Sequence, residues 1–269
     1  MQAAKRPRRA RMSINVMIPN MLTLIALCSG LTAIRYAYEQ QWEYAALAIL
    51  AAAILDALDG RMARLLKGTS KFGQELDSLS DMLCFGVAPP MMLYFWSLKD
   101  YGRYGWIFVL VFAVGCALRL ARFNTAAEDP DPPAWAASFF TGVPAPAAAG
   151  LVLLPMIVSF YLWEDAMRHP ELSAIMTVLV SGLMVSAVPT YSFKKVGLSP
   201  KMVLPLMIVV GLVIASMLNA PWVTLSGILT AYLISIPFAV RAHRAISKRA
   251  GAGDLLDDDA SDDDATVPF

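Results

Sequence analysis

Residues 56–81 read DALDGRMARLLKGTSKFGQELDSLSD and join two strongly apolar stretches of the chain. Asp56 and Asp59 are three residues apart, so they share one face of a helix. Asp77 and Asp81 are four residues apart and share a face in the same way. The KGTS stretch between the two pairs is typical of a turn. The segment therefore predicts two antiparallel helices that bring four carboxylates together.

The composition of the 269-residue chain is that of a membrane protein. Apolar residues make up 58% of it and charged residues 16%, against about 45–50% and about 25% in soluble domains. A soluble globule would need far more polar residues to face water, which excludes an extracellular enzyme and a disordered chain. Cys28, Cys84 and Cys116 lie in apolar runs without metal-ligand spacing, so buried thiols are expected rather than a disulfide scaffold.

Eight apolar segments approach the roughly 20 residues that a helix needs to cross a bilayer. They are Ile18–Ile34, Tyr44–Leu66, Met82–Leu98, Trp106–Phe123, Val143–Trp163, Leu172–Val188, Met202–Leu218 and Trp222–Val240. The predicted fold class is an all-α integral membrane protein with about eight transmembrane helices. The predicted parts are a basic cytoplasmic arm (1–13), a membrane core (14–190), two additional C-terminal transmembrane helices (191–240) and a cytoplasmic tail (241–269).

The distribution of charge predicts that both termini are cytoplasmic. In this orientation 18 of the 22 Lys and Arg residues lie on the inner side, as the positive-inside rule requires. Tryptophans at the outer helix ends form the expected interfacial belt; they are Trp42, Trp96, Trp106, Trp163 and Trp222, with Trp135 alone in an inner loop. The four aspartates then face the cytoplasm, most simply at the plasma or inner membrane of a prokaryote.

The two charged ends of the chain have separate interpretations. The basic arm around Lys5–Arg11 is expected to rest on anionic lipid headgroups. Nucleic-acid binding is the alternative, but no aromatic residue interleaves the arginines, so no nucleic-acid partner is predicted. The acidic run Asp254–Asp264 is a block of like charge without apolar spacing, so disorder is expected there, with metal buffering as a weaker alternative.

Acidic residues at a membrane boundary are functional by default. Several carboxylates in a partly dry site repel one another, so they must take up protons or bind cations. Oxygen ligands without His or Cys favour Mg²⁺ or Mn²⁺. Two such ions about 3.5–4 Å apart would hold the oxygens of a phosphoryl centre.

Residues between the aspartate pairs suit a phosphate-containing ligand. Gly60 and Ala63 leave room for a bulky group against the helix backbone, and Arg64 could bind phosphate oxygens. The alternative is that the acids form salt bridges at the helix ends; their partners would be Arg61, Arg64, Lys67 and Lys71. Salt bridges would explain any one carboxylate but not four on converging faces.

This arrangement of Asp, Gly, Ala-Arg, Gly and two further Asp resembles the signature of the CDP-alcohol phosphotransferase family, and every position of that pattern is present. The resemblance implies that Asp56, Asp59 and Asp77 hold two divalent metals. It also implies that Asp81 binds metal and acts as the catalytic base towards the acceptor alcohol. A homodimer is a further expectation from the family.

The same resemblance implies a site for the CDP-linked lipid. Its predicted residues are Pro19, Asn20, Gly60, Ala63, Arg64, Ser70, Gly73 and Ser78. Pro19-Asn20 is similar to the family's nucleotide-contacting segment, although Asn20 by itself could be an N-cap. The expected reaction transfers a substituted phosphate from the CDP-linked donor to an alcohol and releases CMP, by single displacement without a covalent intermediate.

Two further stretches resemble the phosphatidylserine synthase branch of the family. They are Arg119-Leu-Ala-Arg122-Phe-Asn124 and the GVPAPAAA run that begins at Gly142. The branch implies CDP-diacylglycerol as donor and L-serine as acceptor, with Arg119, Arg122 and Asn124 as acceptor contacts. The alternative for the arginines is positive-inside anchoring with an ion pair to Glu128 or Asp129.

Other functions are retained as alternatives. Within the family, phosphatidylglycerophosphate synthase is the next choice, because an acceptor phosphate would need the same arginines. A membrane transporter could also place carboxylates here, but it would be expected to show internal repeats. The last two spans carry no recognisable motif and are interpreted as scaffold or dimer contacts.

Overall fold

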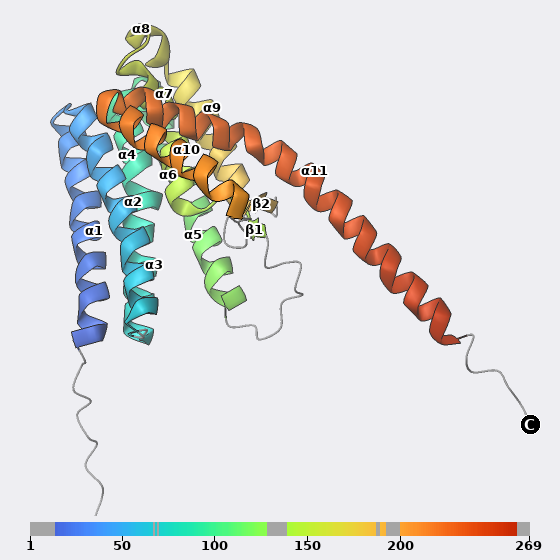
Figure 1. Ribbon diagram of the computed structural model, residues 1–269. Helices are drawn as coiled ribbons and strands as arrows, with labels where there is room; N and C mark the ends of the chain where they lie inside the picture. Colours follow the sequence, from blue (N-terminus) through green and yellow to red (C-terminus); the bar gives the residue numbers. More distant parts are fainter. Residues whose placement is uncertain are drawn as a thin grey trace, which may run out of the picture.

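The computed structural model describes residues 14–66, 68, 70–127, 139–186, 189–191 and 200–262. These residues are almost wholly helical, which confirms the all-α class (Figure 1). The helices are α1 (Ile14–Tyr38), α2 (Trp42–Leu65), α3 (Lys71–Asp81), the π-helix η1 (Met82–Val87), α4 (Ala88–Trp96), the 3-10 helix η2 (Leu98–Tyr104), α5 (Gly105–Ala127), α6 (Ala145–Val152), α7 (Leu154–Ser159), α8 (Glu164–Met167), α9 (Pro170–Val185), α10 (Pro200–Asn219) and α11 (Pro221–Asp262).

Two short strands, which the sequence did not predict, link distant parts of the chain. β1 (Phe139–Thr141) and β2 (Pro189–Tyr191) pair antiparallel, with Phe140 opposite Thr190. Aromatic and β-branched residues in both segments favour extended backbone. The pairing ties the chain before α6 to the chain after α9.

The bundle is built around a close pairing of α1 with α2. Small buried residues line their contact, among them Ala33 and Ala37 on α1 and Ala45 and Ala52 on α2. Side chains of this size let helix backbones approach closely inside a membrane. The pairing places the end of α2 that carries the first two aspartates beside the start of α1 (Figure 1).

The second aspartate pair lies on a helical segment that continues directly into the apolar core. α3 runs without a break into η1 and then α4, so the predicted third span forms the C-terminal part of a longer helical unit. In η1 the buried residues are Cys84, Phe85 and Gly86. A π-turn inside a helix is often found at a functional site, and this one begins directly after Asp81.

Four described helical segments are long and apolar enough to cross a membrane: Val16–Tyr38, Leu98–Thr125, Met202–Asn219 and Pro221–Arg241. They overlap the first, fourth, seventh and eighth predicted spans. Elsewhere the apolar helix α9 is shorter, and the predicted fifth span is divided into α6 and α7. Pro155, in the first turn of α7, has no N–H to continue the preceding helix. The count of eight spans therefore stays a prediction.

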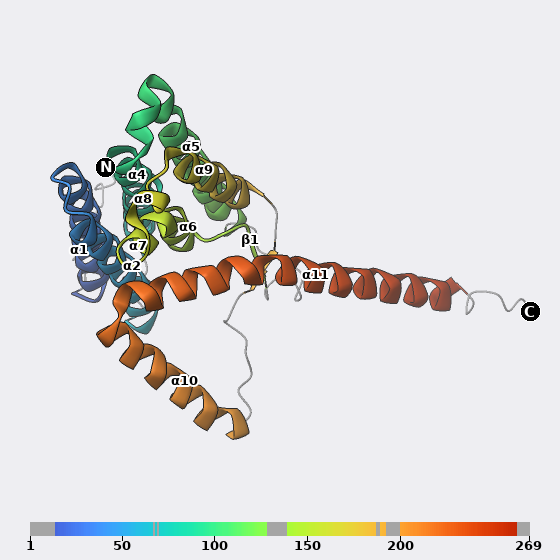
Figure 2. The ribbon, with the colours of Figure 1, turned by 90° about the horizontal axis from the view of Figure 1, so that it is seen from above.

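The last two helices differ strongly in their packing. α10 diverges from the bundle, whereas α11 crosses the bundle and continues well beyond it (Figure 2). α11 extends to Asp262, and the disorder of the acidic run Asp254–Asp264 stays a prediction. Ala, Arg, Lys and Leu are frequent between the apolar span and the acidic run, and such residues propagate a helix. The basic arm, and Asp263 and Asp264, lie outside the described residues.

The start of α3 is held close to α1. The Ser70 hydroxyl accepts a hydrogen bond from the Gly73 N–H at 3.0 Å and so caps α3. A Cβ atom on Gly73 would lie 2.8 Å from Asn20 Oδ1 and 3.2 Å from the Ser70 hydroxyl oxygen. Only a residue without a side chain fits this contact unless its neighbours move.

The Gly73 contact predicts the effect of a single methyl group. Gly73→Ala should lower the free energy of unfolding by about 1–3 kcal/mol, because it overpacks the contact with Asn20. The measurement is the thermal melting of the purified protein in detergent. Gly182→Ala is the matched control, since a Cβ there would meet nothing within 4 Å. Equal melting of the two variants would contradict the proposed tight fit.

Candidate functional site

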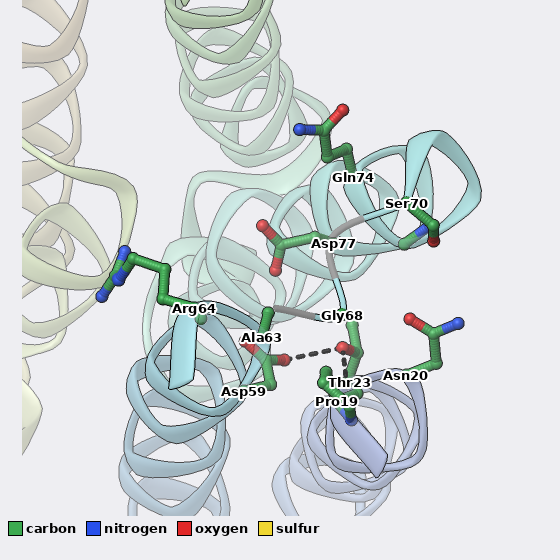
Figure 3. Close-up of a pocket in the computed structure, with 12 residues that line it drawn as sticks. Pro19, Asn20, Thr23, Asp59, Ala63, Arg64, Gly68, Ser70, Gln74 and Asp77 are labelled. Atoms are coloured by element: carbon green, nitrogen blue, oxygen red, sulfur yellow. Dashed lines mark hydrogen bonds between the residues drawn. The ribbon is translucent and has the colours of Figure 1, made fainter. Parts of the chain in front are cut away.

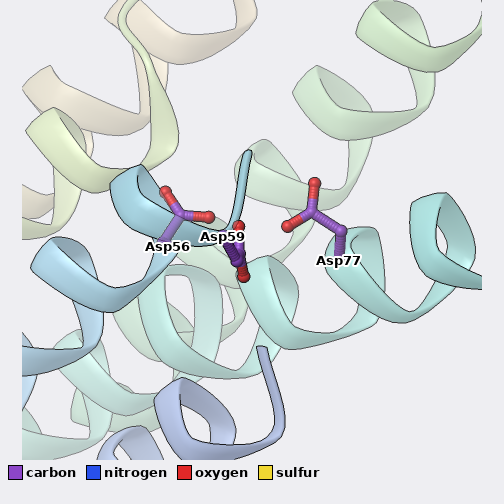
Figure 4. Close-up of side chains that lie close together, drawn as sticks. All are labelled: Asp56, Asp59 and Asp77. Carbon is purple, nitrogen blue, oxygen red and sulfur yellow. The ribbon is translucent and has the colours of Figure 1, made fainter. Parts of the chain in front are cut away.

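The structure brings both aspartate pairs to one place. Carboxylate oxygens of Asp56, Asp59 and Asp77 lie within 4.8 Å of one another, and Figure 4 shows them converging from α2 and α3. Asp81 joins them, because its carboxyl group lies near enough to that of Asp56 for the two groups to interact. The predicted convergence of four carboxylates is therefore present in the structure.

These carboxylates form no salt bridge with a cationic side chain among the described residues. Their side chains form no ion pair with Arg61, Arg64 or Lys71, while Lys67 lies outside the described part. The salt-bridge alternative is thus not supported for these three cations.

Burial, and then the carboxylates of Asp59 and Asp56, raise the pKa of Asp77 to about 7. A group of acids in this environment is suited to binding a cation, which would relieve the repulsion.

The donor set fits a hard divalent metal ion. It consists of carboxylate oxygens from three residues, and their mutual distances allow a single ion to contact all three. Mg²⁺ and Mn²⁺ prefer such oxygen ligands. The cluster could therefore hold metal.

A pocket opens beside the carboxylates, between α1, α2 and α3 (Figure 3). Its lining comprises Pro19, Asn20, Thr23, Asp59, Gly60, Ala63, Arg64, Gly68, Ser70, Gly73, Gln74 and Asp77. Seven of the eight residues predicted to bind the CDP-linked lipid are in this set. The exception is Ser78, which accepts a hydrogen bond from the Asn124 side-chain amide at 3.0 Å.

The space around the pocket glycines differs between Gly60 and Gly73. Gly73 is packed against Asn20, whereas a Cβ on Gly60 would meet nothing within 4 Å. The space beside Gly60 is therefore open to a ligand. In Figure 3 the Arg64 guanidinium points away from Asp59 and Asp77, on the α2 side of the pocket.

Thr23 is a site residue that the sequence interpretation missed. The residue is 4% exposed, and its hydroxyl lies 2.7 Å from Asp59 Oδ2 and 3.1 Å from the Pro19 carbonyl oxygen, both of which can accept its proton. Its backbone carbonyl in turn accepts a hydrogen bond from the Ser80 hydroxyl at 3.4 Å. One sequence signal existed, because Thr23 is a polar residue one helical turn beyond Pro19 and Asn20 in an apolar segment.

The three residues predicted to contact the acceptor occupy different environments. Arg122 donates a hydrogen bond to the Val185 carbonyl at 2.8 Å and so ties α5 to α9. Asn124 contacts Ser78 on α3. Arg119 is half-buried and lies close enough to Asp81 to affect it electrostatically. Glu128 and Asp129, the alternative partners of the arginines, lie outside the described residues.

The contact between Thr23 and Asp59 predicts a loss of metal affinity when it is removed. Thr23→Val deletes a hydroxyl that orients one carboxylate, and the loss of such a supporting contact lowers metal affinity by about 10–100-fold. The measurement is Mn²⁺ binding to the detergent-solubilised protein by isothermal titration calorimetry.

Thr32→Val provides the matched control. Thr32 lies on the same helix and donates to the Cys28 carbonyl four residues earlier, and none of its hydrogen bonds in the described part of the chain reaches a carboxylate. It should leave Mn²⁺ affinity unchanged. Equal affinities of the two variants would show that Thr23 does not support the site.

Comparison with known proteins agrees with this geometry. The sequence profile described as CDP-alcohol phosphatidyltransferase matches residues 16–188, and the one described as CDP-alcohol phosphatidyltransferase 2 matches residues 201–237.

Individual relatives cover most of the chain. A CDP-diacylglycerol–serine O-phosphatidyltransferase of Mycobacterium tuberculosis is 39% identical over 248 residues, which is 89% of this chain and 84% of the relative. The protein of the same name from Helicobacter pylori is 39% identical over 206 residues, or 76% and 84% of the two chains. An archaetidylserine synthase of Methanothermobacter thermautotrophicus is 34% identical over 177 residues, or 64% and 69%.

The extent of these matches and the aspartate pattern at residues 56–81 lead to the same conclusion: the chain belongs to the CDP-alcohol phosphatidyltransferase family.

Proposed function

We propose that this protein transfers the phosphatidyl group of CDP-diacylglycerol to L-serine, giving phosphatidylserine and CMP. The observation that carries the proposal is the convergence of four carboxylates beside the pocket between α1, α2 and α3. Relatives that cover most of the chain and bear the name CDP-diacylglycerol–serine O-phosphatidyltransferase support serine as the acceptor.

Asp56, Asp59, Asp77 and Asp81 would hold two divalent cations, Mg²⁺ or Mn²⁺. When bound, these ions neutralise the pyrophosphate and stabilise the leaving CMP. The chain's own contribution is to fix the carboxylates, with Thr23 orienting Asp59. The donor set, which contains only oxygen, supports a hard cation.

The pocket residues have separate roles in holding the donor. Pro19 and Asn20 line one wall, and Ser70 and Gly73 hold the start of α3 against that wall. The open space at Gly60 and Ala63 accepts the cytidine diphosphate part against the α2 backbone. Arg64 extends from the same helix and would bind phosphate oxygens that lie on its side of the pocket.

The transfer itself is a single in-line displacement. The serine hydroxyl oxygen forms a bond to the phosphorus that carries the diacylglycerol, and the bond from that phosphorus to the CMP oxygen breaks. Asp81 takes the hydroxyl proton, as a general base in the transition state. Arg119, beside Asp81, binds the acceptor carboxylate, whereas Arg122 and Asn124 already contact α9 and α3.

The second candidate is transfer to an acceptor phosphate, as in a phosphatidylglycerophosphate synthase. Arg119 could bind a phosphate as well as a carboxylate, so the geometry of the site allows both. The names of the relatives favour serine. A transporter is disfavoured by the family to which the chain belongs.

The same proposal includes an orientation in the membrane. The protein is an integral membrane protein, and we place eight spans across the plasma or inner membrane of a prokaryote, with both termini and the aspartates on the cytoplasmic side. Residues 14–190 form the core, followed by two spans within 191–240 and a cytoplasmic tail. A pocket lined by Trp42 and Trp96 lies at the opposite end of α2 from the aspartates, which supports an outer aromatic belt. A homodimer remains the expectation for its assembly.

An acceptor assay tests the function. The purified protein is given CDP-diacylglycerol and Mg²⁺ or Mn²⁺ with labelled L-serine, glycerol 3-phosphate or inositol phosphate. We expect metal-dependent phosphatidylserine and CMP from serine alone. Product from glycerol 3-phosphate instead would favour the second candidate, and no CMP release with any acceptor would contradict the enzyme assignment.

The role of Asp81 predicts a separation of catalysis from binding. Asp81→Asn should abolish transfer, a loss of at least about 100-fold, because the variant cannot accept the hydroxyl proton. CDP-diacylglycerol should still bind, as measured by titration of the protein with the lipid. Asp100→Asn, in the exposed part of η2, is the control and should retain activity. Loss of lipid binding equal to the loss of transfer would make Asp81 a metal ligand only.

A further inference from the structure

α3 is a short helix with one fully exposed side. Phe72, Glu75 and Leu79 are exposed, and helical spacing places all three on the same side of the helix. Exposed side chains do not fix the rotation of a helix about its own axis, so contacts elsewhere on α3 must do so. The opposite side carries Asp77 and Asp81, and the directions of their carboxylates depend on that rotation.

Hydrogen bonds join α3 to two neighbouring helices. The Ser80 hydroxyl donates to the Thr23 carbonyl on α1 at 3.4 Å. The Asn124 side-chain amide on α5 donates to the Ser78 hydroxyl at 3.0 Å. α3 also packs against α1 and η1, so the contact from Asn124 holds α3 from a helix other than these two.

The two serines lie on either side of the aspartates around the helix axis. Each residue of an α-helix is rotated by about 100° from the one before it. Measured from Ser78 in one direction, Asp81 lies at about 60° and Asp77 at about 100°. Ser80 lies at about 160° in the same direction. Both aspartates are therefore within the arc between the two hydrogen bonds, and a rotation of α3 would strain both bonds and redirect both carboxylates.

We propose that Asn124 is a positioning residue, which fixes the rotation of α3 through Ser78 and so directs the two aspartates of α3 towards those of α2. The sequence predicts that Ser78 contacts the donor and Asn124 the acceptor, whereas in the structure they contact each other. α5 also carries Arg119, so the same hydrogen bond fixes the helix of the proposed base relative to the arginine proposed for the acceptor carboxylate. The inference rests on the proposed function, because it concerns the same carboxylates.

The test compares Asn124→Ala and Ser78→Ala in the full-length protein, since each variant removes one partner of the hydrogen bond. We expect Mn²⁺ binding to the substrate-free protein, measured by calorimetry, to weaken about five-fold in each, as the loss of one hydrogen bond implies. At saturating Mn²⁺, kcat should fall by a similar factor. The KM for L-serine should change by less than about two-fold, because neither residue is assigned to the acceptor.

Two further variants serve as controls. Ser78→Thr keeps a hydroxyl at the same position and should bind Mn²⁺ within about two-fold of the unaltered protein. Thr125→Val alters the neighbour of Asn124 on α5, whose hydroxyl can donate to the Ala121 and Arg122 carbonyls of its own helix. It should leave Mn²⁺ affinity and kinetics unchanged. A thermal melt of every variant checks folding.

A double variant separates positioning from independent effects of the two residues. If Asn124 acts through Ser78, Asn124→Ala combined with Ser78→Ala should bind Mn²⁺ no more weakly than either single variant. Multiplied losses in the double variant, normal Mn²⁺ affinity in Asn124→Ala, or an undiminished loss in Ser78→Thr would each overturn the inference. A higher KM for L-serine in Asn124→Ala but not in Ser78→Ala would overturn it too, because Asn124 would then contact the acceptor.

The outcomes also distinguish this inference from the proposed function. Absence of transfer to serine by the unaltered protein contradicts the proposed function, while calorimetry with Mn²⁺ still tests the role of Asn124. If the unaltered protein transfers to serine and Asn124→Ala binds Mn²⁺ normally, only the role of Asn124 is overturned.

Discussion

The mutual repulsion of four carboxylates at the boundary of an apolar bundle is the constraint on which the rest of the structure depends. Carboxylate oxygens of Asp56, Asp59 and Asp77 within 4.8 Å of one another are unfavourable without a cation. The surrounding helices must therefore hold them there by other contacts. The alanine-lined pairing of α1 with α2, the hydrogen bond from Thr23, and the close fit of Gly73 against α1 all serve this purpose.

Much of the site could be predicted from local spacing, because helical periodicity alone decides which side chains share a face. The two aspartate pairs and seven of the predicted pocket residues meet as expected. Ser78 does not line the pocket, for the same geometric reason: it is adjacent to Asp77 and is rotated about 100° from it around the helix. It therefore faces Asn124 on α5. Thr23 was missed because one hydroxyl in an apolar helix gives a weak signal.

The remaining features depend on contacts between segments far apart in the sequence. Arg119 and Arg122 share a helical face by spacing, yet Arg122 bonds to the carbonyl of Val185, where α9 ends and leaves carbonyl groups without helical partners. The position of α11 against the core has no local signal either, because its apolar sequence would suit a helix facing only lipid. The helix through the acidic run was likewise not expected from charge alone.

The π-helix Met82–Val87 separates two requirements that one straight α-helix could not meet independently. A π-turn contains one residue more than an α-turn, which advances every later side chain by about 100° around the axis. The acidic face of α3 and the apolar face of α4 can thus be directed towards different neighbours. The length of this π-turn therefore sets the rotation about the helix axis between the side chains of α3, which carries two of the aspartates, and those of α4, which packs in the core. Inserting or deleting one residue there would rotate every side chain of α4 relative to α3.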